Sequence, residues 1–317
     1  MPELKWGYAI NQWDPRRARE RERVFKAISA CGFDGIELEA GTGRMAPLGN
    51  PVQIQMNYGS VRHFLGTMNS YGVKQIVSFF YNPGSPSIEA SHNGKSPVNP
   101  NDHEAILETA RPFGQFLHDV QGLFFVVKAM PAYTAVAPVT EEKIRTAAEC
   151  WNKVGKMMKE YGVQTAMHID CLSAIHSMED IDKILQFTDP DLVGLVIDTA
   201  ELTIAGNNPA QVYEKHHARV KLFHFKDAHD VDSLGEYKGK DAGSLMSAGG
   251  QREIGRWFWE MGRPGGLVDF PGLVKSLKGH NYDGWIIVES DQSPNPYESA
   301  MLNNWYIKHV LSKYKTA

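Results

Sequence analysis

The sequence predicts a single (β/α)₈ barrel, the TIM-barrel fold, over residues 1–317. Three observations support this expectation: a length of 317 residues, eight short apolar runs, and amphipathic segments that separate those runs. One barrel of this type commonly fills roughly 250 residues, and eight alternating strand and helix units close it. We therefore expect one domain with one hydrophobic core.

The eight expected strands are short runs rich in β-branched and aromatic residues. They cover residues 5–10, 34–39, 73–80, 123–128, 163–168, 192–198, 220–225 and 284–289.

Amphipathic segments lie between these runs and are the expected helices. They cover residues 16–30, 57–71, 102–119, 141–161, 177–187, 209–217, 270–279 and 297–313. In 141–161, apolar residues recur at steps of three and four from Ile144 to Met158, which marks one buried helix face. Glycine-containing turns such as CGFDG (31–35) end several helices, since glycine accepts the positive φ of a helix end.

Two connections are longer than the others, residues 81–101 after the third strand and residues 226–268 after the seventh. Both are rich in Gly, Ser, Pro or Asn. Long loops in a compact domain are commonly binding loops, and both leave the carboxyl end of a strand, where barrel enzymes keep their active sites. We expect both loops to cover one mouth of the barrel.

The composition argues against a nucleic-acid partner. The formal net charge is −4, and the one basic run, RRARERER (16–23), alternates with Glu in the manner of a solvated helix face. Three cysteines that lie far apart indicate no disulfide scaffold and fit a reducing compartment. The start has no signal-peptide pattern and no run reaches the ~20 apolar residues of a membrane span, so we expect a cytoplasmic protein with no membrane partner. We also expect the protein to be a homo-oligomer.

Four late strands end in side chains that commonly bind metals. These are His168, Asp198, His224 and Glu289. The carboxyl ends of parallel strands meet at one mouth of a barrel, and a buried ionisable group is costly unless it is paired or metal-bound. The sequence therefore predicts one metal site with these four ligands.

Each of these residues also has a simpler interpretation when it is taken alone. Asp198 could cap the following turn, and His224 could hydrogen-bond to the backbone as a core imidazole. Glu289 could pair with Lys226 or Arg219. The four together are harder to explain in this way.

Mixed imidazole and carboxylate ligands suit Mn²⁺, Co²⁺, Fe²⁺, Zn²⁺ and, less well, Mg²⁺. We expect one divalent ion, with Mn²⁺ as the first choice. Such an ion would polarise a substrate carbonyl and stabilise an enediolate, which makes proton removal beside the carbonyl feasible.

At this point the sequence resembles the xylose-isomerase-like sugar isomerase and epimerase superfamily, and within it the inosose (2-keto-myo-inositol) dehydratases. The matching stretches cover nearly the whole chain. They are KWGYAINQW (5–13), GFDGIELEAG (32–41), VGLVIDTAELTIAGNNP (193–209), VKLFHFKD (220–227) and GGLVDFPGLVKSLKGHNYDGWIIVESDQSPNPYESA (265–300).

The resemblance implies that Asp198, His224 and Glu289 are metal ligands, because IDTAEL, FHFKD and VESDQ match the family's motifs. Two positions depart from the superfamily pattern. His168 stands where most members have Glu, so the pair of glutamates that epimerases use on both faces of the substrate is absent, which favours one-sided proton abstraction with loss of a hydroxyl. Glu201 stands where the family's D-T-G-H motif has His, and we expect it to stay ionised near a divalent ion.

These features predict a metal-dependent lyase of the dehydratase type that acts on a keto-cyclitol or keto-sugar through an enediolate. A sugar isomerase or epimerase on the same metal, and a non-catalytic sugar-binding barrel subunit, are the alternatives. The candidate acid and base residues are Glu201, Lys226, His168 and Glu289. The expected substrate contacts are Trp13, Glu37, Tyr81, His92, Trp257 and Trp259, although the two late tryptophans could equally pack between loops or at an interface.

Overall fold

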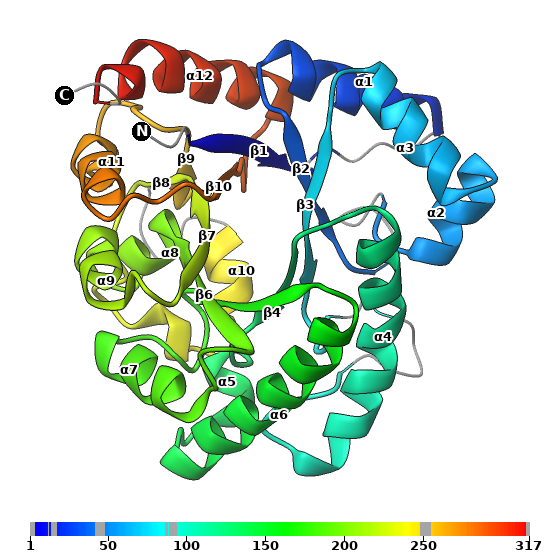
Figure 1. Cartoon of the computed structure of the whole chain (residues 1–317). Helices are drawn as coiled ribbons and strands as arrows, with labels where there is room; N and C mark the ends of the chain where they lie inside the picture. The colour runs from blue at the N-terminus through cyan, green and yellow to red at the C-terminus, as the bar shows by residue number, and fades with distance from the viewer. Residues whose placement is uncertain are drawn as a thin grey trace.

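Eight parallel strands close into a barrel, and helices surround it (Figure 1). This computed structural model describes residues 4–11, 13, 18–41, 48–85, 88, 94–247 and 255–314. The barrel strands are β1 (Lys5–Ala9), β2 (Gly35–Glu39), β3 (Gln75–Tyr81), β4 (Phe124–Lys128), β5 (Gln164–His168), β6 (Val193–Asp198), β7 (Val220–Phe225) and β10 (Trp285–Val288). The expected fold is confirmed, and each predicted strand is present to within two residues at its ends.

The helices are α1 (Ala18–Ala30), α2 (Pro51–Tyr58), α3 (Val61–Ser70), α4 (His103–Asp119), α5 (Tyr133–Val136), α6 (Glu141–Glu160), α7 (Met178–Phe187), α8 (Thr199–Ile204), α9 (Pro209–His216), α10 (Ala242–Ser247), α11 (Phe270–Gly279) and α12 (Pro296–His309). None of the helices described is long and apolar enough to cross a membrane.

The barrel interior is filled by one small apolar side chain from most strands. This inner layer consists of Ala9, Val77, Val126, Ala166, Val196, Leu222 and Ile287. Successive side chains in a strand point to opposite faces, so on most strands the residue two positions later also points inward, one layer nearer the carboxyl ends. In β3 a register shift against β2 interrupts the alternation after Val77, so Ser78 and Phe80 point inward instead. This second layer carries the polar side chains of the mouth.

The outer core lies between the barrel and the helices, and α6 shows how the sequence builds it. Its predicted apolar stripe is buried from Ile144 to Met158. Trp151 also donates from its indole nitrogen to the carbonyl of Ala129, at 2.7 Å, just beyond β4. The apolar face of α6 therefore packs against the barrel, and Gly155 lies against the backbone of Leu192.

The structure differs from the expected helices where local geometry interrupts the periodicity. The segment predicted as one helix over 57–71 contains α3 and only the last two residues of α2, which begins at Pro51 and was not predicted. Gly59 ends α2 with a left-handed φ of 76°, and Ser60 caps α3 by accepting from the amide of His63. The short helices α5, α8 and α10 were not predicted. A helix of four to six residues is too short to show a period of 3.6.

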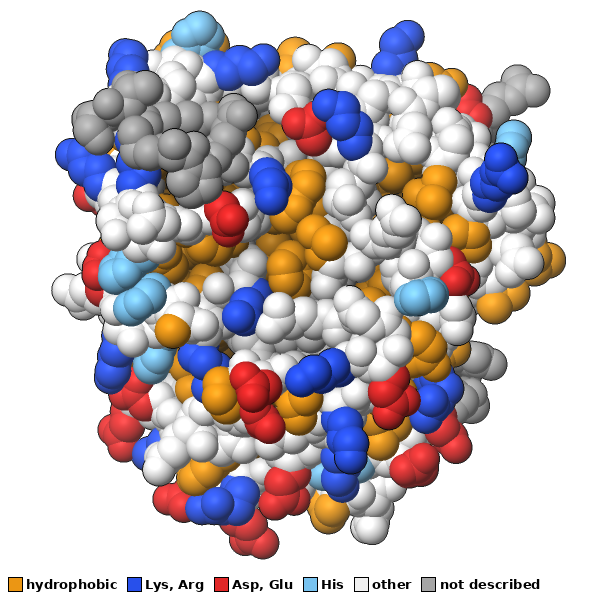
Figure 2. Space-filling view, in the orientation of Figure 1, with side chains coloured by type: hydrophobic (Ala, Val, Ile, Leu, Met, Phe, Trp, Pro, Cys, Tyr) orange, Lys and Arg blue, Asp and Glu red, His pale blue; other side chains and the backbone are white. Residues whose placement is uncertain are grey.

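The segment 226–268, predicted as a loop, contains regular structure. Its strand β8 (Asp227–Ala228) pairs in antiparallel fashion with β9 (Phe258–Trp259), and a 3₁₀ turn and α10 lie between them. On the face shown in Figure 2, hydrophobic side chains line a hollow near the middle of the molecule, with charged side chains around it. The described residues of 226–268, called the insertion after β7, therefore pack as part of the domain.

The close contact at Gly155 gives a stability prediction. A Cβ atom at this position would lie 2.7 Å from the carbonyl oxygen of Leu192, so Gly155→Ala should lower the free energy of unfolding by about 1–3 kcal/mol through overpacking. The matched control is Gly66→Ala in α3, where an added Cβ meets nothing within 4 Å. There the same substitution should raise the free energy by about 0.5–1 kcal/mol. Denaturant unfolding of both variants checks the prediction, and equal effects would contradict it.

Candidate functional site

The four predicted metal ligands meet at the carboxyl-terminal mouth of the barrel. Each lies two positions after an inner-layer residue of its own strand, and each is at most 5% exposed. Nε2 of His168 is 3.2 Å from Oδ2 of Asp198, and Nδ1 of His224 is 3.1 Å from Oε1 of Glu289. The structure therefore brings together side chains from β5, β6, β7 and the residue after β10.

Asp198 fulfils two of the roles considered for it. Its Oδ1 accepts a hydrogen bond from the amide of Glu201 at 2.9 Å and caps α8. Its Oδ2 faces His168 and also lies 3.8 Å from Nδ1 of His224. One carboxylate therefore caps a helix and contributes to the cluster at the same time.

Glu37 joins this cluster from β2, on the far side of His224. Its Oε2 lies 3.2 Å from Nε2 of His224 and accepts a hydrogen bond from Ser78 at 2.7 Å. Ligand atoms of Glu37, His224 and Glu289 all lie within 4.8 Å of one another, as do those of His168, Asp198 and His224. Glu37, expected as a substrate contact, is therefore also placed to be a ligand.

The ammonium group of Lys226 is surrounded by carboxylates. It lies 2.7 Å from Oε2 of Glu289, 3.1 Å from Oδ2 of Asp198 and 3.4 Å from Oε1 of Glu201, and it also contacts Asp291. Burial by itself lowers the pKa of Lys226, but the charges of Asp198 and the other acids outweigh burial and raise it well above the usual value. Lys226 is therefore a fixed cation at this site.

Glu289 shows both of the features that the sequence left as alternatives. It pairs with Lys226 and also contacts His224. Arg219, the other partner considered, instead donates to Leu185, Thr188 and Val193. Burial alone raises the pKa of Glu289, but Lys226 and His224 outweigh it and hold the pKa well below the usual range.

Glu201 is buried on α8, beside Lys226. Its Oε2 accepts from the amide of Cys171 at 2.8 Å, which fixes the carboxylate toward the cation. Burial raises the pKa of Glu201 to about 7, although Lys226 acts in the opposite direction. That Glu201 is ionised beside a bound divalent ion remains a prediction, since this pKa reflects burial and the protein charges alone.

The site also contains residues that sequence reasoning did not select. Asp291 follows Glu289 by two residues, and Lys128 ends β4 and pairs with Asp170 at 2.9 Å. Burial raises the pKa of Asp170, but Lys128 outweighs it and lowers the pKa to about 2. The position of Lys128 at a strand end could have identified it, whereas the pairing with Asp170 depends on how two strands lie in the barrel.

A cavity of about 120 Å³ opens among these side chains. Six carboxylates, one lysine and one histidine line it: Glu37, Glu39, Asp170, Glu201, Glu289, Asp291, Lys226 and His168. Burial, together with the charges of the nearby carboxylates Asp291, Glu289 and Glu37, raises the pKa of Glu39 to about 8. So much buried negative charge is costly unless a cation offsets it.

The donor set fits a divalent ion. Nδ1 of His168 is buried and has no hydrogen-bond partner among the residues described, and both nitrogens of the His224 ring face carboxylate oxygens at 3.1–3.2 Å. Burial lowers the pKa of His224, but the charges of Glu37 and Glu289 outweigh it and raise the pKa well above its usual value. A metal ion would take the place of that proton and supply the missing positive charge.

Three of the predicted substrate contacts pack away from this cavity. Trp13 is buried against Tyr8 and Tyr297, and its indole donates to the carbonyl of Ala9. Tyr81 belongs to β3, which extends one residue further than predicted. Its ring packs outward on Phe113 of α4 and Phe125 of β4. The strand alternation therefore turns Phe80, rather than Tyr81, toward the cavity and the ring of His168.

Trp257 is fully buried in a small core that includes Cys171, Ala200 and Met246. Trp257 therefore packs between loops, which was the alternative considered for it. His92 lies outside the described residues.

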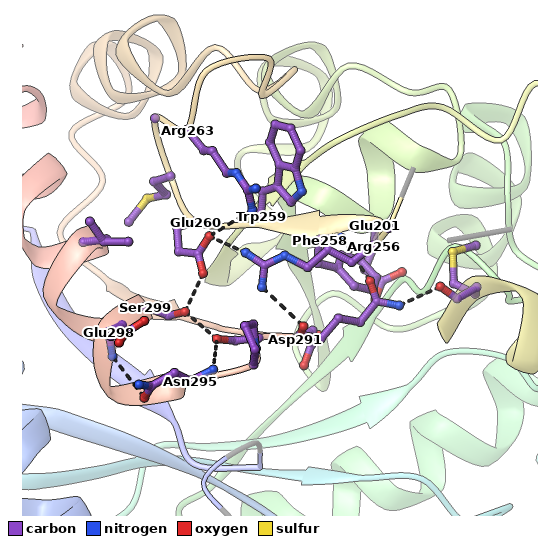
Figure 3. A pocket seen from close by; sticks show the side chains of 18 of the residues that line it. Glu201, Arg256, Phe258, Trp259, Glu260, Arg263, Asp291, Asn295, Glu298 and Ser299 are labelled. Carbon is purple, nitrogen blue, oxygen red and sulfur yellow. Dashed lines mark hydrogen bonds and ion pairs between the residues drawn. The ribbon is translucent and has the colours of Figure 1, made fainter. Parts of the chain in front are cut away.

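A second, larger cavity of about 1120 Å³ lies beside the first and shares Asp170, Glu201 and Asp291 with it (Figure 3). Trp259 lines this second cavity, where His229 stacks on its ring and Arg263 lies over it. The segment 226–268 thus contributes to the mouth as expected. The described residues of 82–101 line neither cavity.

Comparisons with known proteins are consistent with this fold. An inosose dehydratase from Clostridium beijerinckii is 35% identical over 172 residues, which are 53% of this chain and 55% of the relative, so the chain spans about half of that relative's length. The IOLI protein, solved with a zinc atom, has a TM-score of 0.69 and 13% identity, and the match covers 99% of this chain and 100% of that one. A 3-keto-D-glucoside 4-epimerase from E. coli has a TM-score of 0.65 and 14% identity, with the same coverage.

The two solved structures show a common fold at these low identities. The family model described as Xylose isomerase-like TIM barrel matches residues 25–307. Because that match includes most of the chain, this protein belongs to the xylose isomerase-like TIM barrel family.

Proposed function

We propose that this chain is a divalent-metal-dependent lyase of the dehydratase type that acts on a keto-cyclitol or keto-sugar. The observation that carries the proposal is the buried cluster of His168, Asp198, His224 and Glu289 beside the fixed cation Lys226. The relative named inosose dehydratase supports the same class of reaction.

The metal is proposed to be held by His168, Asp198, His224 and Glu289, with Glu37 as a further donor. Mn²⁺ is the first candidate, and Zn²⁺, Co²⁺, Fe²⁺ and Mg²⁺ suit the same mixed donors to differing degrees. A bound divalent ion polarises a ketone and so lowers the cost of removing the neighbouring proton. The zinc atom of the IOLI structure supports a metal in this fold.

The surrounding residues supply the proton transfers. Glu201 is held toward the cavity by the amide of Cys171 and accepts the proton from the carbon beside the ketone. The electron pair of that C–H bond forms a carbon–carbon double bond as the β hydroxyl departs. Lys226 donates a hydrogen bond to the departing oxygen, and Glu201 passes it the proton taken from carbon, so the hydroxyl leaves as water and the reaction needs no oxidant or reductant. His168 and Glu289 also face the mouth and remain further candidates for acid or base.

One contact favours the isomerase or epimerase alternative. Glu37 and Glu289 lie against opposite nitrogens of the His224 ring, so the mouth does contain carboxylates on two sides. Such a pair could remove a proton on one face and return one on the other. A non-catalytic sugar-binding barrel is the third candidate function. It would be favoured if the purified protein held no stoichiometric metal.

The products separate these functions. The metal-loaded protein is incubated with keto-inositols, keto-glycosides and ketoses, and each mixture is followed by ultraviolet absorbance and mass spectrometry. Loss of one water with new absorbance supports the lyase, whereas a product of unchanged mass supports the isomerase or epimerase. A protein that takes up no stoichiometric metal when the divalent ions are supplied, and that changes none of these compounds, contradicts both enzymatic functions.

One prediction of this proposal concerns the metal. Asp198→Asn and Glu289→Gln should each abolish most metal binding, since each replaces a charged oxygen ligand by a neutral amide of the same shape. Asn is as good a helix cap as Asp, so the cap of α8 should survive. Asp269→Asn is the matched control, because Asp269 caps α11 in the same way and lies outside both cavities. Elemental analysis of the purified variants checks this, and full metal content in both site variants would refute the ligand assignment.

The second prediction concerns Glu201. Glu201→Gln keeps the shape of the side chain and removes its proton-accepting charge, so kcat should fall by about 100-fold or more. Metal content and melting temperature should change little, because Glu201 is not one of the proposed ligands. If activity instead persists while the melting temperature falls, the contact with Lys226 is structural and another residue is the base.

A further inference from the structure

The cavity beside the metal cluster is too small to enclose a whole substrate. Its volume is about 120 Å³, whereas pockets that bury organic ligands usually have roughly 300–1,000 Å³. The adjoining cavity of about 1120 Å³ is large enough, and the shared walls Asp170, Glu201 and Asp291 join the two. The small cavity therefore holds the reacting part of a substrate, and any further part extends into the large one.

The wall of the large cavity contains exposed apolar side chains from α12. Glu298, Leu302 and Trp305 lie at helical spacing on this wall, and Leu302 and Trp305 are 55% and 57% exposed. Across the cavity, Phe258 and Trp259 come from β9 (Figure 3). Aromatic and apolar walls with a few polar groups are typical of sites for neutral organic ligands.

The charge of this wall disfavours an anionic ligand. Five carboxylates and two arginines line the cavity. Arg256 and Arg263 share the carboxylate of Glu260, and Lys128 and Lys226 pair with Asp170, Glu201 and Asp291. Counting these four cations, the five carboxylates of the lining still leave a small negative excess, which disfavours an anion.

We propose that the large cavity binds a neutral ring attached to the reacting keto ring, so that the substrate is an uncharged keto-glycoside rather than a free cyclitol or a sugar phosphate. The attached ring stacks on Trp305, and Glu298 at the rim accepts hydrogen bonds from its hydroxyl groups. This inference rests on the proposed function only for the position of the reacting ring.

Calorimetric titration of the metal-loaded full chain tests the proposal with probes that cannot react. The probes are para-nitrophenyl β-D-glucoside, methyl β-D-glucoside and glucose 6-phosphate. The nitrophenyl glucoside should bind at least ~10-fold more tightly than the methyl glucoside, because only its ring reaches the apolar wall. Glucose 6-phosphate should bind no more tightly than the methyl glucoside.

Trp305→Ala should abolish the preference for the nitrophenyl glucoside, and Leu302→Ala should reduce it. Met301→Ala is the matched control, since Met301 is on the same helix and equally exposed at 57% but does not line the cavity. All three side chains are mostly exposed, so thermal melts should show folded variants. Equal binding of the two glucosides, a preference that survives Trp305→Ala, or tightest binding of the phosphate would each overturn the proposal.

The outcome is independent of catalysis. A nitrophenyl preference in a protein that shows no turnover would sustain the large-cavity site and count against the proposed lyase. Turnover of a keto-inositol by a protein that does not prefer the nitrophenyl glucoside would support the proposed lyase and count against the large-cavity site. In turnover assays, Trp305→Ala should raise KM for keto-glycosides without changing KM for a keto-inositol.

Discussion

The site depends on the alternation of side chains in a closed parallel barrel. Ala166, Val196, Leu222 and Ile287 fill the barrel interior, and the residue two positions beyond each of them belongs to the metal cluster. A slip of one residue in β7 would turn His224 outward and bring Phe225 into the barrel. The packing of small apolar side chains below therefore fixes the direction of every donor above.

Charge balance is the second constraint, and it is centred on Lys226. This lysine contacts Asp198, Glu201, Glu289 and Asp291, which come from β6, α8 and the segment after β10. Loss of the lysine from such a buried set would leave its carboxylates uncompensated, at a cost of about 3–5 kcal/mol. Lys226 and the metal ligands are thus coupled, because Asp198 and Glu289 contribute to both.

The loop after β10 links the residues around the two cavities through hydrogen bonds. Gln292 accepts hydrogen bonds from the amides of Trp257 and Phe258 at 2.7 and 3.3 Å and donates to the carbonyl of Met246 at 2.6 Å. Its neighbour Asp291 contacts Lys226. Gln292 also adopts a φ of 56°, a conformation that is uncommon for residues other than glycine. The insertion after β7 is therefore held to the loop that carries the charge cluster by the hydrogen bonds of Gln292, in addition to the contacts of Lys226.

The sequence by itself determined the features that follow from local periodicity. Runs with strand character identified the eight barrel strands, steps of three and four identified the buried face of α6, and polar residues at strand ends identified His168, Asp198, His224 and Glu289. Only the tertiary structure decided which side chains meet across the barrel. The contact of Glu37 with His224 joins residues 187 positions apart, and Tyr81 turned outward because a register shift between β2 and β3 changes the alternation after Val77. Periodicity tells which face a side chain takes, but pairing across the mouth is set by barrel closure and by buried charge, which no local stretch of sequence contains.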